Sequence, residues 1–233
     1  KANTGNGWTM SDSVTFSASG DVNDIGVTLS IELDGDAASA KTNTGTAYDS
    51  TTSMNVVDSH SIALDFGDAG SLTFAGHGGD GAMSAKDDVM PNAYEEAWDV
   101  VAGADAGIIN GHSGNNMFTY QYSHDSGVSL TLAYINASDA VTDVSYNDIG
   151  LEYTGVDGLT IGFGQGETEA TTGTVIDDQT IYATYAYGSL TVGYQVGESD
   201  GPAASNDIDF TGMGLSYAAV SYTHLRAHET HND

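Results

Sequence analysis

The chain has 233 residues, of which 39% are hydrophobic, 30 are Gly and only 2 are Pro. Four Lys and Arg stand against 33 Asp and Glu, so the formal net charge is −29. This charge repels nucleic-acid phosphates, and no nucleic-acid partner is expected. Cysteine is absent, which excludes disulfides, thiolate metal sites and a cysteine nucleophile. No run of roughly 18 apolar residues occurs, so a transmembrane helix is not expected.

Alternating apolar and polar residues predict β-strands along most of the chain. The clearest segment is 25–33, where Ile, Val and Leu take every second position and Gly, Thr, Ser and Glu take the others. The last predicted strand is the weakest, because Gly212 and Gly214 disturb its alternation. The predicted strands are residues 12–19, 25–33, 59–66, 71–77, 116–124, 127–136, 145–154, 158–166, 178–187, 189–197 and 207–217.

The links between these strands alternate strictly between short and long. Short links follow every odd-numbered strand, at residues 20–24, 67–70, 124–127, 155–158 and 188–189. Long polar links follow the even-numbered strands. An up-and-down barrel in an outer membrane has this asymmetry, with tight periplasmic turns and longer outer loops. The fold class predicted is therefore all-β, an antiparallel transmembrane β-barrel with an apolar face toward lipid and a polar face toward a wet lumen.

One link, at about residues 78–115, is far longer than the rest. It contains Ala85-Lys86-Asp87-Asp88-Val89-Met90-Pro91-Asn92-Ala93-Tyr94-Glu95-Glu96-Ala97-Trp98-Asp99. With this loop the chain resembles the general porins of Gram-negative bacteria, most of all the alphaproteobacterial type. The resemblance implies a 16-stranded barrel in the cell outer membrane, usually a homotrimer, whose long third loop folds inward and narrows a pore for small hydrophilic solutes. About 11 of the 16 strands are then present.

The end of the chain departs from this pattern. Residues 221–230 include the only Arg and two His, and they show no strand alternation. They resemble translated sequencing adapter. We therefore expect a partial barrel domain at 1–219 and a non-native tail at 220–233.

The resemblance places function in a charged constriction rather than in a catalytic site. No His-Glu-x-x-His pair and no Gly-x-Ser-x-Gly elbow occurs, so an enzyme is not expected. In the family, acidic residues of the inward loop face a basic cluster on the barrel wall. Because bases are nearly absent here, we expect a pore that prefers cations. The candidate loop residues are Asp80, Asp87, Asp88, Glu95, Glu96, Asp99 and Asp105, and the candidate wall residues are Glu32, Asp65 and Glu152.

Clustered carboxylates also offer oxygen ligands for Ca²⁺, so Asp87 and Asp88, with Glu95 and Glu96, form a candidate calcium site. No cofactor is otherwise required. The alternative function is a secreted, acidic, calcium-binding β-rich module of a surface layer or adhesin. That alternative accounts for the charge and the Gly content, but it gives no reason for the alternation of short and long links.

Overall fold

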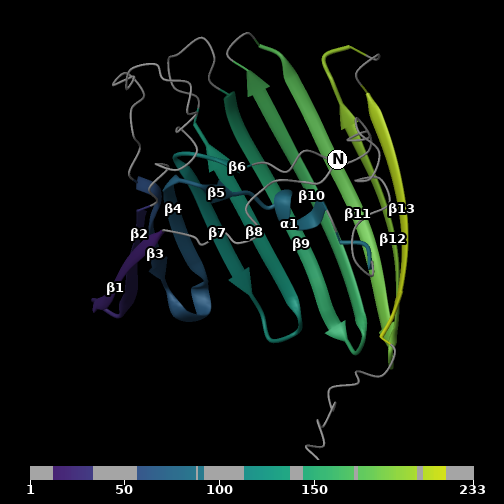
Figure 1. The fold of residues 1–233 in the computed structure, drawn as a ribbon, viewed down its shortest axis with the longest axis horizontal. Helices are drawn as coiled ribbons and strands as arrows, with labels where there is room; N and C mark the ends of the chain where they lie inside the picture. Colours follow the sequence, from purple (N-terminus) through teal and green to yellow (C-terminus); the bar gives the residue numbers. More distant parts are fainter. Residues whose placement is uncertain are drawn as a thin grey trace, which may run out of the picture.

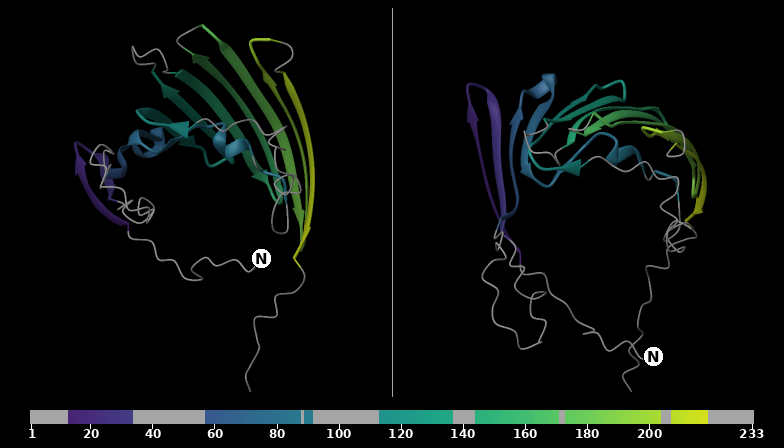
Figure 2. Two further views of the ribbon diagram at one scale, coloured as in Figure 1. Left: turned by 45° about the horizontal axis from the view of Figure 1, so that its top comes forward. Right: turned by 90° about the horizontal axis from the view of Figure 1, so that it is seen from above.

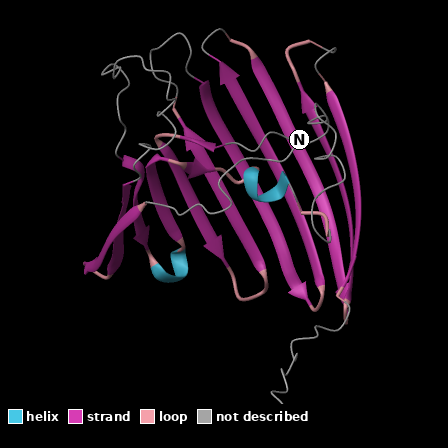
Figure 3. Cartoon of the chain, in the orientation of Figure 1, coloured by secondary structure: helices cyan, strands magenta, loops and turns pink. Residues whose placement is uncertain are grey.

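The computed structural model describes residues 13–33, 57–87, 89–91, 113–136, 144–170, 173–203 and 207–218 (Figure 3). Nearly all of this part of the chain is β-strand, with a short 3₁₀ helix η1 at Gly67–Ala69 and a single helical turn α1 at Ser84–Asp87. The strands are β1 Val14–Val22, β2 Ile25–Leu33, β3 Val57–Asp65, β4 Ser71–His77, β5 Gly79–Asp80, β6 Ser113–Gly114, β7 Met117–Ser123, β8 Val128–Ile135, β9 Val144–Val156, β10 Leu159–Ala170, β11 Val175–Tyr187, β12 Leu190–Asp200 and β13 Ile208–Tyr217.

The main sheet has eleven strands within the described ranges, in the order β1-β2-β3-β4-β7-β8-β9-β10-β11-β12-β13. Within this sheet each strand pairs antiparallel with the strand before it and the strand after it, and β4 pairs with β7 across the long link. The sheet curves into a wide arc with one concave face (Figures 1 and 2). This meander confirms the predicted antiparallel, up-and-down barrel wall, which is partial in this chain.

The short links lie together at one end of the sheet. The link between β1 and β2 is only Asn23–Asp24, with φ of 52° and 64°. Two residues with positive φ are typical of the tight hairpin turn whose twist matches that of its strands. The sequence had predicted a five-residue link at 20–24, which was too long. Asp21 and Val22 continue the strand ladder, because that ladder joins backbone groups and does not require apolar side chains.

The same effect lengthens the strands at the opposite end of the sheet. β11 begins at Val175 rather than at residue 178, and β12 ends at Asp200 rather than at 197. Polar residues there pair as neatly as apolar ones, for example Asp177 with Asp200. As a result β9 to β12 have 11 to 13 residues, whereas β1 to β4, β7 and β8 have 7 to 9.

The two faces of the sheet differ in chemistry, as the alternation predicted. On the convex side Leu132, Ile181 and Val192 are exposed, at 39%, 49% and 39%. Their strand neighbours Thr131 and Thr180 point to the concave side, because successive side chains alternate between faces. An uncovered apolar face is costly in water and is suited to lipid.

One small ribbon was not predicted. β5 pairs with β6 through Gly79–Gly114 and Asp80–Ser113, which joins the two ends of the long link at 78–115. Each strand has only two residues, too few to show a period of two in the sequence. The ribbon fixes where the long link leaves and rejoins the sheet.

Candidate pore constriction

The described residues that follow β5, 81–87 and 89–91, lie on the concave face of the sheet, where α1 sits over β9 and β10 (Figures 1 and 2). Ala82 and Met83, just before α1, are completely buried. The predicted inward fold of the long loop is therefore present in this part of it. We call these ten residues the docked segment.

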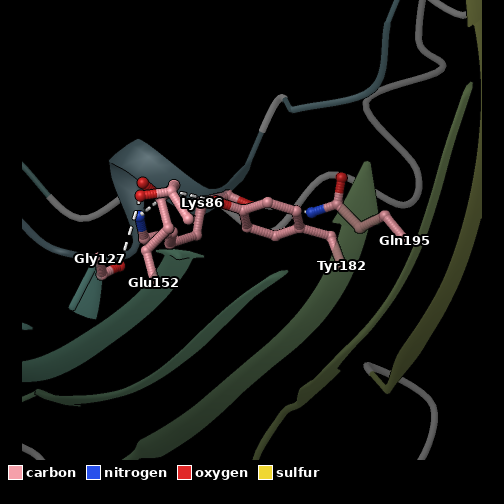
Figure 4. Close-up of polar contacts among 6 residues, drawn as sticks. Lys86, Gly127, Glu152, Tyr182 and Gln195 are labelled. Atoms are coloured by element: carbon pink, nitrogen blue, oxygen red, sulfur yellow. Dashed lines mark hydrogen bonds and ion pairs between the residues drawn. The ribbon is translucent and has the colours of Figure 1, made fainter. Parts of the chain in front are cut away.

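Lys86 in α1 forms the central contact between the docked segment and the wall. Its Nζ lies 2.9 Å from Oε2 of Glu152 on β9. The same carboxylate oxygen accepts a 2.5 Å hydrogen bond from the hydroxyl of Tyr182 on β11 (Figure 4). Glu152, Gly162 and Tyr182 occupy one row across β9, β10 and β11, and the Tyr182 ring reaches Glu152 by lying over Gly162. A side chain at position 162 would collide with that ring.

Two further wall residues hold the backbone of the docked segment. Gln195 on β12 donates from Nε2 to the carbonyl oxygen of Lys86 at 2.7 Å and to Oγ1 of Thr180 at 3.0 Å. Asp148 on β9 accepts from the backbone N–H of Met83 at 2.8 Å through Oδ2. The N–H groups at the start of a helical turn lack partners within the turn, so this wall carboxylate satisfies one of them.

Glycines on the concave face make room for the docked segment. A Cβ placed on Gly150 would lie 3.1 Å from Cβ of Ala82, and one on Gly164 would lie 2.7 Å from Sδ of Met83. On β12 and β13 the same holds for Gly193 against Pro91 Cδ at 2.5 Å, Gly212 against Met90 Cγ at 3.2 Å, and Gly214 against Pro91 O at 2.6 Å. We call these five glycines the glycine track. Gly212 and Gly214 weakened the strand prediction. Gly214 is explained by the close approach of the Pro91 backbone, and at Gly212 a Cβ would meet the side chains of Phe210 and Met90.

The candidate acidic residues differ in what they contact. Glu152 touches the docked segment, whereas Glu32 and Asp65 bond locally, to Ser59 Oγ at 3.3 Å and to the N–H of Gly67 at 2.9 Å. Asp80 is exposed in β5, and its backbone oxygen accepts from Thr119 Oγ1 at 3.4 Å. Asp87 ends α1, but its side chain is outside the described part. The remaining candidates, Asp88, Glu95, Glu96, Asp99 and Asp105, also lie outside the described residues.

Sequence reasoning missed Asp148, Tyr182 and Gln195. Each lies at an inward position of a strand, and the period of two could have placed it on the polar face. Lys86 was noted only as a loop residue. Nothing in local periodicity reveals that it meets a wall residue 66 positions away. The partner of each residue could therefore be found only from the fold.

No group of three or more His, Asp or Glu residues that could hold a metal ion occurs in the described ranges. The calcium candidates Asp87 and Asp88 are outside what this observation tests, because their side chains are not described. In the same part of the chain, no helix has the length and apolar character needed to cross a membrane.

A curved antiparallel meander with an apolar convex face, a polar concave face and a loop segment docked inside defines the class of outer-membrane β-barrels. A family model described as "Gram-negative porin" matches residues 1–232, and the chain belongs to this family. It is thus an outer-membrane protein, as predicted, and its family consists of channels rather than enzymes. The secreted-module alternative has no support.

Solved structures with the same fold include a loop-deletion mutant of OmpT, an outer membrane protein of Vibrio cholerae, with 14% identity and a TM-score of 0.60. The match covers 89% of this chain and 68% of that one. The anion-selective porin from Comamonas acidovorans matches with 17% identity and a TM-score of 0.57, over 88% of this chain and 63% of that one. The chain thus spans about two-thirds of the length of these structures. A comparison with curated protein sequences found no match.

Proposed function

We propose that the complete protein forms a water-filled channel for the passive diffusion of small hydrophilic solutes, that this channel prefers cations, and that it assembles as a homotrimer. Family membership supports the channel. The trimer follows from the resemblance set out above. At 17% identity, the anion selectivity stated for the Comamonas porin does not transfer to this chain.

The observation that carries the cation preference is that the basic side chain in the described part of the chain is paired with an acidic one. Lys86 is the one Lys or Arg within the described ranges, and it forms an ion pair with Glu152. Its charge is thereby neutralised by the wall. The formal net charge of −29 leaves acidic groups dominant over the whole chain. Carboxylates in a narrow wet lumen attract cations and repel anions.

The reversal potential of the complete protein in a planar bilayer tests this proposal. We expect stepwise channel openings. Across a gradient of KCl, the reversal potential should have the sign of the K⁺ equilibrium potential. A reversal potential of the sign set by Cl⁻ would contradict the cation preference. Absence of stepwise conductance, in protein that shows the heat-dependent gel shift of a folded barrel, would contradict the channel itself.

A further inference from the structure

We propose that Glu152 and Gln195 are positioning residues that hold the docked segment against the wall, and that they thereby determine the width of the pore and the charge that the segment presents to solutes. This inference rests on the proposed channel function and names the wall residues that set its selectivity. Neither residue needs to contact a solute for this role.

The first step of the argument concerns the charge of Lys86. Its side chain is 10% exposed, and that of Glu152 is 29% exposed. A cation removed from water to this degree needs a partner, because its desolvation is otherwise uncompensated. Glu152 supplies that partner, and Tyr182 orients the same carboxylate. The positive charge therefore serves attachment of the segment and is not presented to the lumen.

The second step concerns the neutral anchor. Gln195 is 2% exposed and reaches the backbone of Lys86 rather than its side chain. A bond to the backbone fixes the path of the segment. Lys86 is held by its ammonium group from β9 and by its carbonyl oxygen from β12, and those two strands are separated by β10 and β11. At about 4.8 Å between neighbouring strands, the two anchors come from strands roughly 14 Å apart.

The third step is that the segment has a covered side and an open side. Ala82 is fully buried against Gly150, whereas Ala85, three residues later, is exposed. If the two anchors hold the segment in place, their loss must uncover Ala82 and leave Ala85 as it was. The two alanines therefore report on docking with the same chemical change at each site.

The test is cysteine labelling, read on the peptide that carries residue 82 or 85, since these 233 residues contain no other Cys. Ala82→Cys and Ala85→Cys are made separately in the complete protein and treated with iodoacetamide, a small neutral reagent, in folded protein. Mass spectrometry measures the rate of modification. We expect A85C to react readily and A82C to be protected. Adding Glu152→Gln or Gln195→Ala should raise the A82C rate roughly tenfold or more, as expected for loss of a hydrogen bond that holds a charged or backbone group.

Glu32→Gln is the matched control, because Glu32 is a concave-face glutamate that bonds to Ser59 and does not touch the docked segment. It should leave the A82C rate unchanged. Equal reactivity of A82C and A85C would overturn the inference, and so would E152Q and Q195A effects no larger than that of E32Q. Q195A changes no charge, so it gives the answer if E152Q does not fold. Since labelling requires no current, protection of A82C without channel activity would contradict the proposed function and leave the positioning role standing.

Discussion

The Nζ of Lys86 and the Oε2 of Glu152 lie 2.9 Å apart, with the base on the inward segment and the acid on the barrel wall. The resemblance to porins had implied the opposite polarity, in which acidic loop residues face basic wall residues. At this position the arrangement is reversed. Lys86 therefore attaches the loop to the wall, and replacing its ammonium group should change both the ion selectivity of the pore and the position of the loop.

Lys86→Gln should increase the preference for cations, because it leaves the negative charge of Glu152 uncompensated. Glu152→Gln should decrease it, because a cation is then released without a partner. The double variant K86Q/E152Q has the net charge of the parent and should return close to its selectivity. Reversal potentials in a KCl gradient measure all three. Shifts of the same sign for the two single variants would contradict the pair.

Gly164→Ala should displace the docked segment, because the added Cβ would lie 2.7 Å from Sδ of Met83. Forcing an extra methyl group into a filled space typically costs about 1–3 kcal/mol. The temperature at which the folded form is lost on a detergent gel should fall. Gly20→Ala is the control, since a Cβ at Gly20 meets nothing within 4 Å. Equal stability of the two variants would show that Met83 does not occupy this space in the membrane.

Tyr182→Phe should be milder than Tyr182→Ala. The Phe variant loses the 2.5 Å hydrogen bond to Glu152 but keeps a ring over Gly162. A hydrogen bond to a charged group is worth about 1.5–3 kcal/mol. The Ala variant also uncovers Gly162, and the loss of a buried aromatic ring lowers the stability further. Thermal unfolding in detergent would rank the parent first, then Y182F, then Y182A; if the two variants coincide, the ring adds nothing beyond its hydroxyl.

Leu132→Arg and Thr131→Arg test which face of the sheet meets lipid. Leu132 is on the convex face, where an Arg near the centre of the bilayer costs about 2–4 kcal/mol. Thr131 is the preceding residue of β8 and points to the concave face, where an Arg should remain hydrated and shift the reversal potential toward anions. Thermal unfolding and selectivity together distinguish the two. A stable L132R and an unstable T131R would invert the assignment of the faces.

The strands were the part of the fold that local sequence could predict. β2 and β4 have the predicted bounds, 25–33 and 71–77, because an alternating pattern reports directly on a sheet with one apolar face. Contacts between distant residues could not be predicted in this way. The role of Gly214 depends on Pro91, and that of Glu152 depends on Lys86. Both depend on where a loop lies after folding, and the period of a strand carries no information about that.

The unequal strand lengths have a consequence for the shape of the channel mouth. A strand of 13 residues exceeds one of 9 by about 13 Å at roughly 3.3 Å per residue. On β10, β11 and β12 the outward residues that come next after Phe163, Ile181 and Val196 are the polar Gln165, Gln179 and Glu198. The extra length of β9 to β12 thus extends beyond the hydrocarbon layer on one side of the barrel (Figure 1). Solutes approaching along the membrane surface therefore meet a raised wall over β9 to β12.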